Sequence, residues 1–202
     1  AGKKESFLNL QTSAKGTLSP IKEDSIKFDE SENIFIEGDN LETLKLLQKS
    51  YFEKVKLIYI DPPYNTGHDF VYHDDFRNSL KAYKEQTNQV DSEGKELSTN
   101  NESSGRFHSD WISMMYPRLF LARNLLKDDG VIFVSIDDNA VHNLRLIMNA
   151  LFGEENFLTD VIWNSTKSVT NTAIISTSHT QNLGYFKKKE YFIKKREECM
   201  LP

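Results

Sequence analysis

KLIYIDPPYNTG, at residues 56–67, joins an apolar run to a rigid acidic turn. The run at 56–60 has apolar residues at consecutive positions, as a buried parallel strand does. The two prolines that follow fix φ at about −65° and keep the residues before them out of the helical region, so Asp61 and Pro62 are held extended. We therefore expect a strand that carries a carboxylate, two prolines and the ring of Tyr64 to one edge of a sheet.

Asp61, Pro62 and Tyr64 suit the transfer of a group to an exocyclic amine of a nucleobase. Such a nitrogen is a poor nucleophile because its lone pair is delocalised into the ring. The Asp61 carboxylate and the Pro62 carbonyl can accept its two N–H bonds, while Tyr64 stacks on the base. A base inside a duplex must be flipped out to reach such a site, at a cost of about a few kcal/mol. The alternative is a strand that ends in a Pro-Pro turn with a solvated aspartate.

Strand and helix patterns alternate along residues 31–165, and this order predicts an α/β fold with a twisted, mainly parallel sheet and helices on both faces. The predicted elements are a strand at 33–37, a helix capped by Asn40, a strand at 56–60, a helix at 111–127 that Pro117 should bend or split, a strand at 131–136, a helix capped by Asp138 or Asn139 that ends at Gly153, and a strand at 158–163. Ligands bind such sheets outside the carboxyl ends of the strands, where Asp39 and Asp61 lie. A helix cap alone would also explain Asp39.

Two more blocks accompany the DPPY tetrapeptide: IEGDNLETL at 36–44, and WISMMYPRL at 111–119 running on to GVIFVSIDD at 130–138. In this order and spacing the blocks resemble the modification subunit of type III restriction-modification systems, within the permuted group of adenine-N6 DNA methyltransferases. The resemblance covers roughly residues 30 to 165, and it is far more specific than the tetrapeptide alone.

The resemblance implies an incomplete Rossmann-like methyltransferase domain that uses S-adenosyl-L-methionine as its cofactor and methylates a flipped-out adenine. It also implies roles for individual residues. The implied catalytic residues are Asp61, Pro62, Pro63 and Tyr64. The implied cofactor-binding residues are Asp39, Asn40 and Asp61. The implied substrate-binding residues are Tyr64, Asn65, Thr66, Trp163 and Asn164.

One departure from the family concerns its glycine-rich cofactor turn, Phe-x-Gly-x-Gly, which nothing in this chain matches. The nine glycines are scattered singly. The chain therefore resembles the N-terminal portion of a longer enzyme, and we expect it to bind the cofactor weakly or not at all by itself. Within it we expect a polar arm at 1–30, a partial catalytic domain at 31–165 with a long polar loop near 84–108, and the start of a linker or target-recognition region at 166–202.

Composition is that of an ordinary soluble domain, with 38% hydrophobic and 27% charged residues among 202. No apolar run approaches the roughly 18 to 20 residues that span a membrane, and the N-terminus lacks a secretory apolar core, so we expect a cytoplasmic protein. The single cysteine, Cys199, cannot form an internal disulfide, and no group of Cys and His has zinc spacing, so we expect no structural metal.

The net charge of −5 is unusual for a DNA-binding chain, because phosphate contacts require Lys or Arg. Basic and aromatic residues do alternate at 186–196, as in a nucleic-acid contact or a solvated amphipathic helix. From the resemblance we expect double-stranded DNA and a restriction (Res) subunit as partners, and a homodimer of the full-length protein.

Two other functions fit the same residues. The DPPY motif also serves cytosine N4, which presents a similar amine, although Asp rather than Ser at position 61 favours adenine. The other is a truncated, non-catalytic fragment that folds, dimerises or binds a partner subunit, which the missing glycine turn supports.

Overall fold

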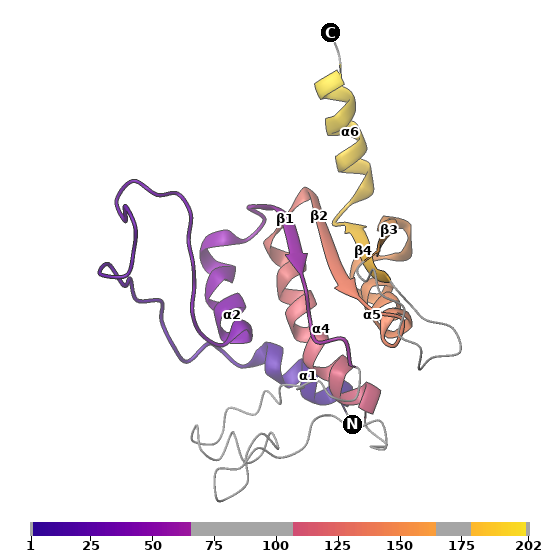
Figure 1. Cartoon of the computed structure of the whole chain (residues 1–202), viewed down its shortest axis with the longest axis horizontal. Coiled ribbons are helices and arrows are strands. Elements are labelled where there is room, and N and C mark those ends of the chain that lie inside the picture. Colours follow the sequence, from indigo (N-terminus) through magenta and orange to yellow (C-terminus); the bar gives the residue numbers. More distant parts are fainter. Residues whose placement is uncertain (1, 66–106, 165–178, 201–202) are drawn as a thin grey trace, which may run out of the picture.

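The computed structural model describes residues 2–65, 107–164 and 179–200 (Figure 1). Its elements in chain order are α1 (Gly2–Gln11), α2 (Asn40–Tyr51), β1 (Val55–Ile60), α4 (Phe107–Leu125), β2 (Leu126–Ile136), α5 (Val141–Phe152), the short 3-10 helix η1 (Glu154–Asn156), β3 (Phe157–Asn164), β4 (His179–Phe186) and α6 (Lys189–Met200). No helix within these ranges is long and apolar enough to cross a membrane. Residues 84–106 of the expected polar loop lie outside the described residues.

The four strands form one sheet in the order β1-β2-β4-β3. β1 and β2 are parallel, with Ile58 opposite Ile132 and Ile60 opposite Val134. β4 is antiparallel to both β2 and β3, so β3 runs in the same direction as β1 and β2. The predicted α/β class with a mainly parallel sheet is confirmed, and β4 is the reversed strand among those described.

The domain boundary expected at residue 165 does not separate this sheet. β4 at 179–186 lies between β2 and β3 and pairs with both of them. The segment expected to begin a linker or a recognition region therefore contributes an internal strand. The spacing of apolar residues did not indicate this strand, because half of it, HTQN at 179–182, is polar.

The hydrophobic core lies on one face of the sheet, under α4 and α5. Alternate residues of β1, β2 and β4 point to this face, as strand geometry requires. The core residues, fully or partly buried, include Ile58, Ile60, Trp111, Met115, Leu119, Ile132, Val134, Leu144, Met148, Leu183 and Tyr185. α4 and α5 thus fix the positions of β1 and β2, whose carboxyl ends carry the candidate residues.

The opposite face of the sheet is largely open in the described part of the chain. Leu57 and Tyr59 on β1 are 57% and 63% exposed. Among the described residues, the strand at 56–60 is therefore buried on one face only. α6 reaches the open face at one end, where the ring of Phe192 packs on Phe186 at 4.7 Å.

The strand expected at 33–37 is not formed, and Ile34 and Phe35 are exposed. A strand needs a partner for its backbone N–H and C=O groups, and none of the described strands pairs with this segment. α2 begins at Asn40, one residue before the predicted start, because its cap is Asp39 rather than Asn40. The Asp39 Oδ1 accepts a hydrogen bond from the Glu42 N–H at 2.9 Å.

α4 is one continuous helix through Pro117, which we expected to bend or split it. Proline has no N–H, so Pro117 leaves the carbonyl of Ser113, four residues earlier, without its helical donor. Ser6 of α1 replaces that donor, because its Oγ bonds the Ser113 carbonyl at 3.2 Å. The ring of Phe7 packs on Tyr116 at 5.6 Å. The polar arm expected at 1–30 therefore begins with α1, which packs on α4 next to Pro117.

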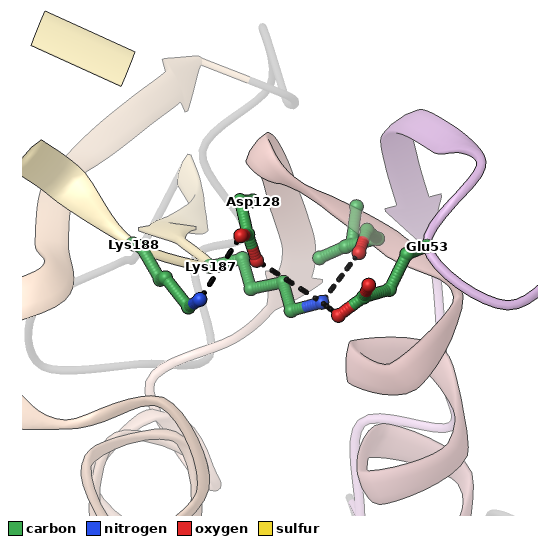
Figure 2. A network of polar contacts seen from close by, with 5 residues as sticks. Glu53, Asp128, Lys187 and Lys188 are labelled. Carbon is green, nitrogen blue, oxygen red and sulfur yellow. Dashed lines mark hydrogen bonds and ion pairs between the residues drawn. The ribbon is translucent and has the colours of Figure 1, made fainter. Parts of the chain in front are cut away.

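A buried lysine ties the end of β4 to the start of β2 (Figure 2). The Lys187 side chain is only 5% exposed, and its Nζ lies 2.7 Å from Glu53 and 3.5 Å from Asp128. It also donates to the Leu126 carbonyl at 2.8 Å, while Lys188 bonds Asp128 at 3.0 Å. Because a buried ammonium must be paired, these carboxylates hold β4 in register against β2.

The same contacts change the interpretation of the basic stretch at 186–196. Lys195 bonds Asp129 at 3.0 Å, so three lysines of the stretch, with Lys187 and Lys188, are paired inside the chain. Those three charges neutralise carboxylates at the start of β2. The solvated-helix interpretation fits α6 better than a nucleic-acid contact does.

We predict that Asp128→Asn lowers the free energy of unfolding by about 1 kcal/mol at pH 7, because hydrogen bonding to Lys188 holds the pKa of Asp128 below its usual range. A depressed pKa stabilises the fold above the unfolded-state pKa, near 3.9, and this contribution disappears as pH falls through the folded-state pKa. Urea unfolding of both proteins between pH 7 and pH 3 measures the difference, with exposed Asp24→Asn as control. A difference independent of pH would show that Asp128 acts through packing rather than charge.

Candidate active site

The candidate residues lie at one edge of the sheet because β1, β2 and β3 run in the same direction. Asp61 follows β1, Asp137 follows β2, and Asn164 ends β3. In such sheets ligands bind at the carboxyl ends of the strands. The structure therefore places the three strand ends that carry predicted or polar residues at the same edge.

The loop that leaves β1, Asp61–Asn65, is called the exit loop below. Asp61 is exposed, whereas Pro62 behind it is buried. Asn65 ends the described part of the loop at φ +59°, in the left-handed region that asparagine tolerates, and it is 1% exposed. The loop thus presents one carboxylate to solvent from a base that is rigid and buried at both ends.

Tyr64 holds that carboxylate. Its hydroxyl donates to Asp61 Oδ1 at 2.8 Å, and its ring packs against the hydrophobic core. Burial, followed by the hydrogen bond to Asp61, raises the pKa of Tyr64 to about 12. The phenol is therefore neutral at physiological pH and remains a donor. The pattern of the sequence indicated a stacking role for Tyr64 and gave no sign of this bond.

Trp111 fixes the middle of the exit loop from α4. Its indole Nε1 donates to the Pro63 carbonyl at 2.7 Å, and the side chain is fully buried. Trp111 is part of the hydrophobic core. The hydrogen bond adds a second role, because the indole N–H orients the peptide group between Pro63 and Tyr64.

His108 and Asn143 hold the last residue of the exit loop. The Nδ1 of His108 lies 3.1 Å from Asn143 Nδ2 and 3.5 Å from Asn65 Nδ2. Both partners are amide groups that carry N–H, so Nδ1 is the acceptor in this arrangement. His108 of α4 thus links Asn143 of α5 to the end of the exit loop. Sequence reasoning missed His108 and Asn143, because neither falls in a block with recognisable spacing.

Asp39 and Asn40 lie at the start of α2, after Gly38, whose φ is +148°. The three residues 38–40 are called the α2 cap turn below. Asp39 caps the helix, and Asn40 Oδ1 accepts from Arg118 Nε on α4 at 2.7 Å. The helix-cap alternative for Asp39 is therefore what the structure shows, and Asp39 remains exposed. Its role toward a cofactor stays a prediction.

Trp163 and Asn164 are at the same edge of the sheet but on its far side. Trp163 is 64% exposed, and both residues are separated from Asp61 by β2 and β4. Three strand spacings of about 4.8 Å give a lateral separation of roughly 14 Å. The structure does not bring them into contact with the exit loop. Thr66 lies outside the described residues.

Further polar residues at this edge were not predicted as site residues. The Tyr59 hydroxyl contacts Ser135 Oγ, which donates to Asn182 Oδ1 at 2.6 Å on the open face of the sheet. Asp138, expected as a helix cap, instead accepts from Gln181 Nε2 at 2.6 Å. Within the described ranges, no group of three or more His, Cys, Asp or Glu side chains could hold a metal ion.

Comparison with known proteins finds the DNA methylase family, whose model matches residues 55–200. The Type III restriction-modification enzyme StyLTI Mod subunit of Salmonella typhimurium is 51% identical over 142 residues, which are 70% of this chain and 22% of that protein. The EcoP15I Mod subunit of Escherichia coli is 42% identical over 165 residues, or 81% and 25% of the two chains.

The chain therefore spans about a quarter of the length of these two relatives. Among solved structures, the cytosine-N4-specific PvuII DNA methyltransferase matches with a TM-score of 0.43 and 13% identity. That match covers 73% of this chain and 47% of the other.

We predict that Asp61→Ala lowers the pKa of Tyr64 only part of the way from about 12 toward its ordinary value of 10, because burial is the largest cause of the shift and the Asp61 bond the second. The ring-carbon NMR signal of Tyr64, followed between pH 9 and pH 12, measures this pKa in both proteins. A return to the ordinary value would show that Asp61 accounts for the whole shift. No change would show that the two side chains do not interact in solution.

Proposed function

Because the chain belongs to the DNA methylase family, whose model covers residues 55–200, we propose that it is the catalytic part of a type III adenine-N6 DNA methyltransferase. The enzyme transfers a methyl group from S-adenosyl-L-methionine to a flipped-out adenine in double-stranded DNA. The observation that carries this proposal is an exposed Asp61 carboxylate held by Tyr64 on a rigid loop at the carboxyl edge of the sheet. The relatives named as type III Mod subunits support the choice of system.

In this proposal Asp61 and the Pro62 carbonyl accept the two N–H bonds of the adenine amino group. Tyr64 already donates to Oδ1 of the exposed Asp61, so Oδ2 is the oxygen that accepts from the amine. Drawing both N–H bonds to one side exposes the nitrogen lone pair for in-line attack. Asp61 acts as a fixed acceptor, and the rigidity of the two prolines supplies the positioning.

Tyr64 has two tasks in the proposal. Its hydroxyl orients the carboxylate, and the exposed part of its ring stacks on the flipped base. Stacking of a base on an aromatic ring is worth about 1 to 3 kcal/mol, which offsets part of the cost of extrusion. Asn65, Thr66, Trp163 and Asn164 line the remainder of the base pocket in this proposal. The roughly 14 Å between Trp163 and the exit loop means that these two groups contact different parts of the extruded nucleotide.

The α2 cap turn fits the adenosine part of the cofactor. Asp39 is exposed and uses Oδ1 for the helix cap, so its second oxygen can accept a hydrogen bond from the ligand. Asn40 lies beside it, oriented by Arg118. The bound cofactor supplies an electrophilic methyl group on a sulfonium. Asp39, Asn40 and Asp61 hold it against the exit loop and exclude water from that side.

The partners in this proposal are double-stranded DNA, a restriction (Res) subunit and a second copy of the full-length protein, in the cytoplasm. The names of the type III relatives support the restriction partner. The net charge of −5 and the internal pairing of Lys187, Lys188 and Lys195 limit the phosphate contacts that residues 2–200 can provide. Most of the DNA affinity in the proposed enzyme therefore comes from other segments or subunits.

To test the function, the matching 142 residues of the Salmonella relative are exchanged for those of this chain, and the product is called the chimera. We expect the chimera to methylate DNA and Asp61→Asn to reduce turnover by at least about a hundredfold, because an amide presents N–H where a carboxylate oxygen accepts. Lys127→Gln, an exposed change at the start of β2 and so at the opposite end of the strands, is the matched control.

Mass spectrometry of digested DNA identifies the product of this assay. N6-methyladenine supports the proposal, whereas N4-methylcytosine would move the chain to the cytosine-N4 alternative. A chimera that melts as a folded protein but transfers no methyl group would contradict the enzymatic function and favour the non-catalytic alternative.

We also predict that the 202-residue chain alone binds S-adenosyl-L-methionine at least about a hundredfold more weakly than the chimera does. The α2 cap turn and the exit loop can contact the ligand from one side only, so its polar groups stay in water. Isothermal titration calorimetry of both proteins measures the two dissociation constants, with Asp39→Ala in the chimera as a check on the site. Equal affinity would show that residues 1–202 contain a complete cofactor pocket.

A further inference from the structure

Two side chains of α4 bond the two halves of the candidate site. Trp111 donates to the Pro63 carbonyl in the exit loop, and Arg118 donates to Asn40 in the α2 cap turn, both at 2.7 Å. They are seven residues apart, which is two helical turns, so they lie on the same face of α4 about 10 Å apart along its axis. One rigid helix therefore contacts both segments through directional bonds.

The bond from Trp111 determines where the exit loop lies. The indole is fully buried, so its N–H has no access to water and must be satisfied within the fold. The Pro63 carbonyl satisfies it, between Asp61 on one side and Tyr64 and Asn65 on the other. His108, one turn earlier on α4, bonds Asn65, so the same helix holds the loop at two points.

The bond from Arg118 determines where the α2 cap turn lies. The side chain is only 7% exposed, and Nη1 donates to the Met114 carbonyl at 2.7 Å, which locks the guanidinium against its own helix. Nε then donates to Asn40, the first residue of α2. Burying a guanidinium costs free energy that apolar packing of α2 on α4 would not require. The bond therefore adds directional placement of the turn to the packing.

We propose that α4 is the positioning element of the site, and that Trp111 and Arg118 set the separation between the exit loop and the α2 cap turn. This inference rests on the proposed function, in which the exit loop orients the amine and the α2 cap turn holds the adenosine. A transfer in line requires the two groups to be held at a fixed separation, and small displacements are costly in rate. α4 maintains that separation because both bonds originate from the same helical face.

The proposal predicts different kinetic effects for the two residues in the chimera. Trp111→Phe removes the indole donor, so we expect kcat to fall about tenfold or more with little change in the KM for S-adenosyl-L-methionine. Arg118→Met keeps the length of the side chain without its donors, so we expect that KM to rise about tenfold with a smaller change in kcat. Phe152, at the C-terminal end of α5, is buried like Trp111 but bonds neither segment of the site. Phe152→Leu is therefore the control for lost stability.

Conservative variants separate positioning from packing. Arg118→Gln places an amide nitrogen the same number of bonds from Cα as Arg Nε, so it should restore the KM lost in Arg118→Met. His108→Leu should lower kcat several-fold and His108→Asn should restore it, because Asn Oδ1 can replace the Nδ1 acceptor. His108 is exposed, so this second pair gives an answer on the exit loop even where Trp111→Phe does not fold.

All variants are assayed well below their melting temperatures. The inference is overturned when Phe152→Leu reproduces the losses, when the Trp111 and Arg118 variants change kcat and KM alike, or when Gln and Asn restore nothing. Activity of the unmodified chimera is the separate test of the proposed function. A chimera that methylates while Trp111→Phe and Arg118→Met behave like Phe152→Leu would leave the function intact and remove only the role of α4.

Discussion

The hydrogen bond from the buried indole of Trp111 to the Pro63 carbonyl fixes the point at which the chain leaves the sheet. Asp61 is exposed and Tyr64 only partly buried, so this bond, together with the buried Pro62 and the contact between His108 and Asn65, holds them in a defined position. The indole N–H is buried away from water, where leaving it unpaired would cost about 1 to 3 kcal/mol. Trp111 therefore belongs both to the hydrophobic core and to the candidate site at the edge of the sheet.

α4 can hold the exit loop in place because the hydrogen bond that Pro117 removes from the helix is replaced by another. Pro117 removes a backbone donor from the middle of the helix, and Ser6 of α1 bonds the Ser113 carbonyl in its place. Next to it, the Arg118 guanidinium bonds the Met114 carbonyl. Two side chains thus satisfy carbonyls at the level where a proline usually kinks a helix. α1 and α2 both pack on α4, and Figure 1 shows α2 beside α4 and α1 against its lower part.

At the opposite end of the sheet, ion pairs join the strands in addition to apolar packing. Lys187 brings Glu53 and Asp128 together (Figure 2), and Lys195 pairs with Asp129. These lysines form ion pairs with carboxylates of the same chain. The two ends of the strands therefore differ: ion pairs surround the start of β2, whereas Asp61 is exposed at the carboxyl end of β1.

The sequence by itself determined the α/β class, the positions of β1, β2 and β3, and the family, because local apolar spacing and the rigid DPPY turn are encoded in neighbouring residues. It did not predict β4, the one-sided burial of β1, the failure of residues 33–37 to form a strand, or the use of the lysines at 187–195 in internal pairs. Each of these depends on which distant segment supplies a partner. The bonds of Trp111, His108 and Arg118 likewise join residues 35 to 78 positions apart. Only the tertiary structure brings such groups within hydrogen-bond distance, since a directional bond between distant residues leaves no periodic trace in the chain.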